Sequence, residues 1–337
     1  MFAKQFIKAA LLAAGLAASS AALAQDIQAR TLKLATASPE GHAGVVGAHR
    51  FADLVAEKSG GKMKVNLFPG GVLGGDAQTI SATQGGTIDF VLVNTGIFSN
   101  QVKEAGIFDF PFLFASAEEA DKVVDGPVGQ AIHKKFEDKG MVGLAYWELG
   151  FRNITNNRRP IQTVEDIDGL KLRVIPSTIN LDWVRAVGGN PTPLAWPEVY
   201  AALEQRAIDG QENPVTIISA NRLDEVQKHM VMTRHVYNPQ SLVMSKRTWD
   251  KLSEAEQTIV SDAAKETAVF QRQYQRESEG AALEKLKQGG MQVTELSDEQ
   301  QQHLRELMKP VIAKHAAIVG QETVDAVQAE LAGLRGE

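Results

Sequence analysis

Two periods of hydrophobicity alternate along the first hundred residues. Residues 30–36 alternate apolar and polar positions as a half-buried strand does, and 44–59 carries apolar residues at helical spacing. A second strand pattern covers 62–68, and 88–93 is a nearly continuous apolar run, which is typical of a strand buried on both faces of a parallel sheet. The chain is therefore predicted to open as strand, helix, strand, with a short helix at 78–86 before the next strand.

The same alternation continues through the middle of the chain. Strand patterns occupy 142–147 and 170–175, and helical patterns occupy 180–187 and 196–207. This repeated β/α order predicts a doubly wound α/β architecture, in which ligands bind beyond the carboxyl ends of the strands.

The last third of the chain has a different character. From 253 to 288 it is rich in Ala, Glu, Lys, Gln and Arg, which favour helix, and Gly280 is its candidate break point. A capping signal at 297–300 then predicts a further helix that ends near Gly320.

The first 24 residues have the pattern of an export signal. Lys4 and Lys8 precede a short apolar stretch, and Ala22 and Ala24 provide the small residues of a cleavage site. We expect a signal peptide over 1–24, cleavage near Ala24 and a periplasmic mature protein. The alternative is an N-terminal membrane anchor. The apolar stretch is, however, shorter and richer in alanine than a membrane-spanning helix normally is.

Composition narrows the classes of function. The 337 residues contain 35 Lys and Arg against 41 Asp and Glu, and the length predicts two domains. The net charge of −6 argues against a nucleic-acid partner, because non-specific binding to phosphates requires positive charge. The absence of cysteine excludes thiol nucleophiles, Cys-ligated zinc, iron–sulfur clusters and disulfides.

The sequence contains none of the common catalytic or cofactor motifs. The glycine-rich segment 70–75 fits neither the dinucleotide-binding nor the phosphate-binding loop, and the seven histidines have no metal-ligand spacing. We therefore predict no catalytic residue, metal or cofactor. An enzyme acting on a sugar acid is the alternative. Asp76, Glu148 or Glu212 could then be the general acid or base, but the sequence shows no motif that pairs any of them with a second catalytic residue.

Three polar segments lie where strands are predicted to end. Residues 150–153 include Arg152 and precede a turn composition, and 209–214 is predicted to be a polar turn. Arg173 lies in the middle of an alternating apolar segment, where a charge is costly unless an anion meets it. That anion is either a ligand or an internal Asp or Glu.

Three ordered motifs carry a family resemblance. The segments 169–174, 191–203 and 209–214 resemble, in order and spacing, the signature of extracytoplasmic solute-binding proteins of TRAP transporters. The resemblance extends over essentially the whole mature chain. It implies a two-lobed α/β fold with crossing strands and a long helix across both lobes. The implied lobe I comprises 26–150 and about 240–280, and lobe II comprises 151–239 and about 281–330.

The resemblance also implies which residues of lobe II and the crossing strands meet the ligand. Arg173 matches the arginine that grips the ligand carboxylate, Arg152 matches a second site arginine, and Asn213 matches an asparagine that donates to the same carboxylate. A guanidinium fork presents parallel N–H donors to the two carboxylate oxygens. Trp196 matches an aromatic wall, and Gln240 matches a polar contact on the second crossing strand.

The opposite lobe is expected to select among carboxylic acids. Asn94 matches a residue that is acidic in the sialic-acid binders, which argues against that ligand, and Asp76 and His42 are the other expected contacts. This set is neutral to acidic, apart from a histidine that is largely uncharged at pH 7. It therefore favours a hydroxylated monocarboxylate, a uronate or an aldonate. The alternatives are a C4-dicarboxylate or a small 2-hydroxy or 2-oxo acid.

The resemblance finally implies a division of labour in transport. A monomeric binding protein is expected to deliver the acid to the small and large membrane subunits of a TRAP permease, which a sodium gradient drives. A binding protein of an ABC transporter would also have two lobes, but its sequence would not be expected to contain the three motifs.

Overall fold

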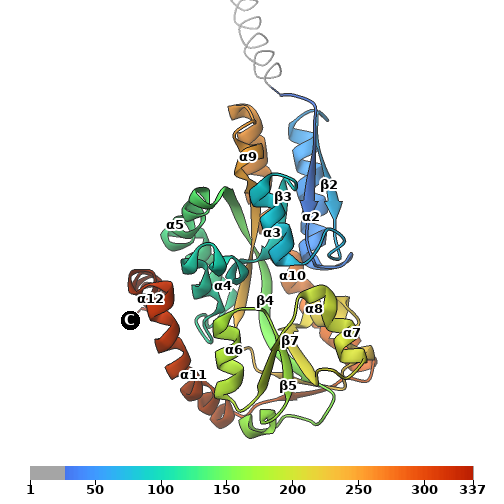
Figure 1. Ribbon diagram of the computed structural model, residues 1–337, viewed down its shortest axis with the longest axis vertical. Helices are drawn as coiled ribbons and strands as arrows, with labels where there is room; N and C mark the ends of the chain where they lie inside the picture. The colour runs from blue at the N-terminus through green and yellow to red at the C-terminus, as the bar shows by residue number, and fades with distance from the viewer. Residues whose placement is uncertain (1–26, 337) are drawn as a thin grey trace, which may run out of the picture.

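A computed structural model of the protein describes residues 27–336, and its two lobes occupy the upper and lower halves of Figure 1. The predicted signal peptide over 1–24 lies outside the described residues. Within the described part of the chain, none of the helices combines the length and the apolar character that a membrane span requires.

The upper lobe is built on the β/α units that the sequence predicts. Strand β1 (Arg30–Ala35) lies between β2 (Met63–Phe68) and β3 (Phe90–Asn94) and runs parallel to both. Helices α2 (Ala43–Lys58) and α3 (Asp76–Gly85) connect these strands. The predicted strands at 30–36, 62–68 and 88–93 are therefore confirmed to within two residues.

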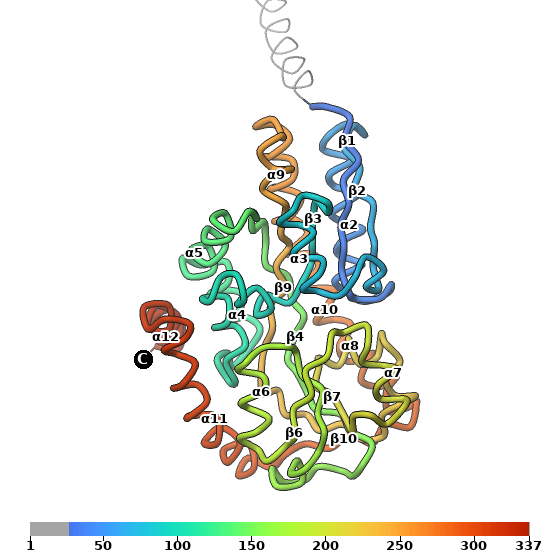
Figure 2. Tube along the Cα trace, in the orientation of Figure 1, coloured from blue at the N-terminus to red at the C-terminus, as the bar shows by residue number. Residues whose placement is uncertain are grey.

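Two long strands cross from one lobe to the other, side by side in Figure 2. β4 (Met141–Asn156) pairs antiparallel with β9 (Tyr237–Ser245) over its first part. Its last five residues pair instead with β7 (Gly210–Pro214) of the lower lobe. The predicted strand at 142–147 is too short, because β4 continues through 150–153, where it is buried on both faces and its alternation disappears.

The lower lobe repeats the parallel arrangement. β5 (Lys171–Val174) lies between β6 (Asn190–Pro193) and β7 and runs parallel to both. The prediction of a polar turn at 209–214 was wrong, since all five residues of β7 are buried. The remaining elements here are α6 (Thr178–Ala186), α7 (Val199–Glu204), α8 (Val215–Ala220), β8 (His229–Met232) and β10 (Gln292–Glu295).

The predicted long helix spans both lobes without a break. α10 (Glu254–Gln288) contacts α2 of the upper lobe, the crossing strand β4 and α8 of the lower lobe. A break at Gly280 was predicted and does not occur, because nothing approaches that position and no packing forces the helix to bend there. Ser253 caps the helix by accepting a hydrogen bond from the backbone N–H of Glu256.

The C-terminal helices return along the side of the molecule to the upper lobe. α11 (Asp298–Val319) begins after the predicted cap at Ser297 and ends at Gly320 as predicted. α12 (Gln321–Arg335) then packs against α4 (Ala117–Asp125) and α5 (Pro127–Lys135), on the left in Figure 1. The short elements are α9 (Lys246–Trp249) and the 3-10 helices η1 (Thr95–Asn100), η2 (Lys103–Asp109), η3 (Glu137–Lys139), η4 (Val164–Ile167), η5 (Trp196–Glu198) and η6 (Leu223–Glu225).

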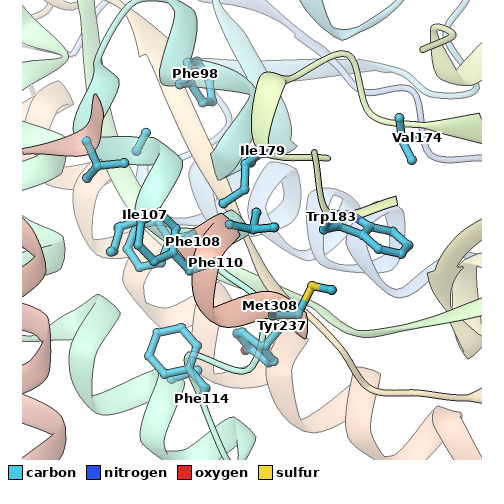
Figure 3. Packing of buried hydrophobic residues seen from close by; sticks show 14 of the residues in the cluster. Phe98, Ile107, Phe108, Phe110, Phe114, Val174, Ile179, Trp183, Tyr237 and Met308 are labelled. Atoms are coloured by element: carbon cyan, nitrogen blue, oxygen red, sulfur yellow. The ribbon is translucent and has the colours of Figure 1, made fainter. Parts of the chain in front are cut away.

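One hydrophobic core joins the lobes. Its buried side chains include Phe98 and Phe108 of the upper lobe, Val174 and Trp183 of the lower lobe, and Met308 of α11 (Figure 3). A second core lies between α2, α10 and the upper sheet, and a third lies under α7 and α8. The lobes are thus held by packing as well as by the crossing strands. The exact division into lobes stays a prediction.

Candidate ligand-binding site

A cavity of about 50 Å³ lies between the two lobes. The carboxyl ends of parallel strands from both lobes form part of its wall. This is where ligands bind in open α/β sheets. The predicted site residues that line it are Arg173, Arg152, Asn213, Trp196, Gln240, Asn94 and Asp76. The remaining wall is formed by Thr36, Ala37, Ser38, Leu92, Val93, Ile97, Leu149, Ile175 and Ile217.

Arg173 on β5 brings a buried positive charge into the cavity. Its Nε and Nη2 donate hydrogen bonds to the backbone oxygen of Leu194 at 3.0 and 2.8 Å, and it makes no ion pair with any described residue. Burial lowers the pKa of Arg173 to about 10, so the side chain stays charged at neutral pH. The charges of Glu212 and Asp76 act on this guanidinium without an ion pair, and N–H donors on Nη1 and Nη2 remain for an anion in the cavity.

Trp196 and Asn213 flank this arginine. The guanidinium carbon of Arg173 lies 5.3 Å from the centroid of the Trp196 ring, within the range of a cation–π interaction. The Asn213 amide donates one hydrogen bond to Gln211 Oε1 at 2.7 Å, which orients the side chain within β7. The arginine, ring and amide together form a wall that fits one carboxylate.

Arg152 on β4 lines the same cavity and has an internal partner. It binds both carboxylate oxygens of Glu212, with Nη2 to Oε1 at 2.8 Å, and its Nη1 donates to Asn238 Oδ1 at 3.0 Å. Burial alone would raise the pKa of Glu212, but Arg152 and the nearby His235 hold that pKa at about 2. Glu212 thus neutralises Arg152, and among the described residues of the cavity Arg173 is the cation that forms no ion pair.

Asn94 and Gln240 form the polar floor on the upper-lobe side. They are cross-strand neighbours on β3 and β9. The Asn94 amide donates to Asn238 Oδ1 at 2.9 Å, and its oxygen accepts from the Gly96 backbone at 3.1 Å. Gln240 Oε1 is buried with no hydrogen-bond partner among the described residues, in space that is left free by Gly44. Gln240 thus lines the cavity while its unpaired oxygen packs against Gly44, and a buried acceptor without a partner costs free energy.

Asp76 supplies an anionic acceptor at the start of α3. Its half-buried carboxylate makes no hydrogen bond or ion pair with a described residue. Burial raises the pKa of Asp76 to about 6, and the charge of Arg173 opposes that rise. At neutral pH this carboxylate is therefore ionised and accepts hydrogen bonds from the cavity.

His42 lies at the N-terminus of α2 and does not line the cavity. Its Nδ1 accepts a hydrogen bond from the Gly44 backbone at 3.1 Å, and burial lowers the pKa of the imidazole to about 4. The side chain is therefore neutral at pH 7 and adds no positive charge to the upper lobe. Its predicted contact with a ligand stays a prediction.

Sequence reasoning missed two hydroxyl groups in the wall. Thr36 and Ser38 are both buried and line the cavity directly after β1. The signal was available, since Thr36 ends a predicted strand and Ser38 follows it by two residues, and Asn94 likewise lies at the end of β3. They add small donors and acceptors to a side of the cavity that has no cation.

A groove of about 390 Å³ continues from the cavity to the surface past Asp76, Arg173 and Trp196. Its walls come from the glycine-rich loop 70–75 of the upper lobe and from 195–198 of the lower lobe. In residues 27–336, no three His, Asp or Glu side chains gather as a metal site would require. The arrangement can thus hold one carboxylate and hydrogen-bond to hydroxyls next to it.

Comparisons with known proteins identify the family of the chain. Residues 34–318 match the model of the DctP family, bacterial extracellular solute-binding protein family 7. A TRAP periplasmic solute-binding protein from Ochrobactrum anthropi, solved with a C-terminus bound in its ligand pocket, is 49% identical with a TM-score of 0.82, covering 92% of this chain and 97% of that one.

Two further solved structures contain bound acids. A TRAP periplasmic solute-binding protein from a Polaromonas species, bound to D-erythronate, is 40% identical with a TM-score of 0.85, covering 89% of this chain and 98% of that one. The sugar-acid-binding protein DctPAm from Advenella mimigardefordensis, in complex with galactonate, is 37% identical with a TM-score of 0.89, covering 91% and 99%. The chain therefore belongs to family 7 of the bacterial extracellular solute-binding proteins, the non-enzymatic periplasmic receptors of TRAP transporters that bind organic acids.

Proposed function

We propose that the protein binds a hydroxylated monocarboxylate of the aldonate or uronate type. The observation that carries the proposal is the distribution of charge in the cavity. Arg173 is buried without a carboxylate partner on one side, whereas the other side presents Asp76, Asn94 and Gln240. One ligand carboxylate would meet the arginine, and ligand hydroxyls would donate to the acceptors opposite.

A second carboxylate fits this cavity less well. It would require a cation at the far end, but His42 is neutral at pH 7 and lies outside the lining. Arg152 is neutralised by Glu212, and Asp76 would repel a second anion. The C4-dicarboxylate alternative therefore lacks a partner for its second charge.

Two relatives support the class of acid. The Polaromonas and Advenella proteins are described with D-erythronate and galactonate, which are both polyhydroxylated monocarboxylates. The alternative of an enzyme acting on a sugar acid is wrong, because the family consists of solute-binding proteins and not of enzymes.

The ligand class is testable by thermal unfolding in the presence of single acids. A ligand that binds the native state raises the apparent stability of the protein. The increase grows with the ratio of the ligand concentration to the dissociation constant. We expect D-galactonate, D-galacturonate and D-erythronate to raise the melting temperature more than succinate or malate does. A screen in which only the C4-dicarboxylates stabilise the protein would overturn the proposal.

Asp76→Asn provides the selectivity control for this screen. The substitution keeps the size of the side chain. It removes the negative charge of the carboxylate that is expected to accept hydrogen bonds from ligand hydroxyls. A hydrogen bond to a charged group contributes about 1.5 to 3 kcal/mol, so the affinity ratio of galactonate to succinate is expected to fall about tenfold. Glu198→Gln, on the groove wall and outside the cavity, is expected to leave the ratio unchanged.

We further propose that the protein is exported, with its signal peptide cleaved near Ala24, and delivers the acid to a sodium-driven TRAP permease. Family membership supports this step. Uptake by proteoliposomes is expected to require this protein, the cognate permease and a sodium gradient together. Uptake driven by ATP without a sodium gradient would contradict the proposal.

A further inference from the structure

The two lobes touch each other at the mouth of the groove. A Cβ atom added at Gly71 would lie 2.9 Å from Pro197 Cγ, and one added at Gly75 would lie 3.4 Å from Ala195 Cβ. Gly71 and Gly75 belong to the upper lobe, whereas Ala195 and Pro197 belong to the lower lobe. We call this set of four residues the closure contact.

The upper-lobe side of the closure contact is fixed to the cavity wall. The Gly70 backbone N–H donates to the backbone oxygen of Ser38 at 2.7 Å, and the Gly71 backbone N–H donates to the backbone oxygen of Thr36 at 3.1 Å. Thr36 and Ser38 line the cavity. The loop 70–75 therefore cannot move away from the lower lobe without disturbing the part of the cavity wall that Thr36 and Ser38 form.

The lower-lobe side is fixed to the arginine. Leu194, one residue before Ala195, accepts both hydrogen bonds from Arg173 through its backbone oxygen. Pro197 directly follows Trp196, whose ring lies over the Arg173 guanidinium. The position of Pro197 against the opposite lobe is thus coupled to the position of the groups expected to hold the carboxylate.

Glycine at position 71 is required by both backbone and space. Its φ of +73° lies in the left-handed region, and the proline ring leaves no room for a side chain. Gly70 has nearly the same φ, +70°, but nothing lies within 4 Å of a Cβ added there. The two neighbours therefore share the backbone requirement and differ in the contact with the other lobe.

We propose that the closure contact is the stop that sets how far the lobes close over the ligand, with Gly71 and Pro197 as its positioning residues. This inference rests on the proposed function, since the closure contact borders the same site. A side chain at position 71 would meet Pro197 before the cavity is fully closed. The ligand would then lose contacts from one lobe although the substituted residue never touches it.

The first test compares Gly71→Ala with Gly70→Ala by titration calorimetry with D-galactonate, D-galacturonate and succinate. Both variants place alanine in a left-handed conformation, so their difference isolates the contact with Pro197. We expect Gly71→Ala to weaken binding of the acid that binds the wild type by at least tenfold relative to Gly70→Ala. Equal affinities of the two variants would overturn the inference.

Pro197→Ala distinguishes a clash from a general disturbance of the loop. The substitution removes the Cγ atom that a Cβ at position 71 would meet. In its presence, Gly71→Ala is expected to cost less than threefold in affinity. A cost of tenfold or more in the Pro197→Ala background would show that Gly71 acts through its own backbone and would overturn the stop.

A second test needs no ligand. The chain contains no cysteine, and the separation between Gly75 and Ala195 is close to the Cβ–Cβ distance of about 3.5 to 4.5 Å in disulfides. The pair Gly75→Cys and Ala195→Cys therefore reports closure by its rate of oxidation. Gly71→Ala is expected to slow that rate at least fivefold, and Gly70→Ala is not.

The two tests separate the inference from the proposed function. If none of the three acids binds the wild type, the ligand proposal fails while the oxidation rates still decide the stop. If an acid binds but Gly71→Ala oxidises as fast as Gly70→Ala, the stop is wrong and the ligand proposal stands.

Discussion

Replacing Arg173 by lysine is expected to weaken acid binding by about 2 to 5 kcal/mol, because a buried anion would lose its matched charge-assisted hydrogen bonds. Lysine keeps the charge, but its ammonium cannot reproduce the planar fork that binds two carboxylate oxygens. It also cannot hold the two hydrogen bonds that Arg173 donates to Leu194. Charge alone is therefore not expected to rescue binding.

The fold should survive this substitution. Arg173 makes no ion pair with a described residue, so its loss leaves no internal carboxylate buried alone. Calorimetry with the acid that stabilises the wild type most measures the effect, and urea unfolding checks the fold. Lys171→Met, an exposed position on the same strand, is the matched control. Binding by Arg173→Lys within threefold of the wild type would remove Arg173 from its assigned role.

The hydrophobic pattern predicted the parallel β/α units because their strands are short apolar or alternating segments and α2, between the first two, carries one apolar face. β1, β2 and β3 all lie where the pattern put them. The helix α10 was also predicted, since it is long and carries almost no residue that breaks helices. These elements depend on local sequence, which is visible without the tertiary structure.

β4 and β7 were mispredicted for the opposite reason. Their last residues are polar and buried, and side chains from distant parts of the chain satisfy them. Thr155, for example, donates to Gln227 at 2.8 Å and accepts from Gln211 at 2.9 Å. A run such as 209–214 looks like a solvated turn unless these partners are known, because isolated Asn, Asp and Gly favour turns.

The composition of the site was predicted better than its electrostatics. The family resemblance named seven residues that the structure brings to one cavity, but it did not reveal that Arg152 has an internal ion-pair partner and Arg173 has none. Their difference arises from Glu212, which lies 60 positions from Arg152 and forms an ion pair with it across β4 and β7. Such a pairing follows from strand register, which the sequence pattern did not reveal.

This difference predicts opposite consequences for the two arginines. Replacing Arg152 by methionine would leave Glu212 buried without its cation, and breaking a buried pair in this way costs about 3 to 5 kcal/mol of stability. Arg152→Met is therefore expected to lower the free energy of unfolding by that amount, as measured by urea denaturation at pH 7 without ligand. Arg173→Met is expected to lower it far less.

A double substitution and a pH series test the cause. Adding Glu212→Gln to Arg152→Met removes the stranded charge, so the double variant is expected to regain more than half of the lost stability. In the wild type the pKa of Glu212 is about 2, below its usual 4.5. The pair therefore stabilises the protein fully above about pH 4.5 and progressively less toward pH 2. Without Arg152, burial raises the pKa of Glu212, so the stability gap between the wild type and Arg152→Met should narrow as the pH falls from 7 to 4. A gap below 1 kcal/mol at pH 7, or one that widens on acidification, would show that the ion pair does not hold β4 and β7 together.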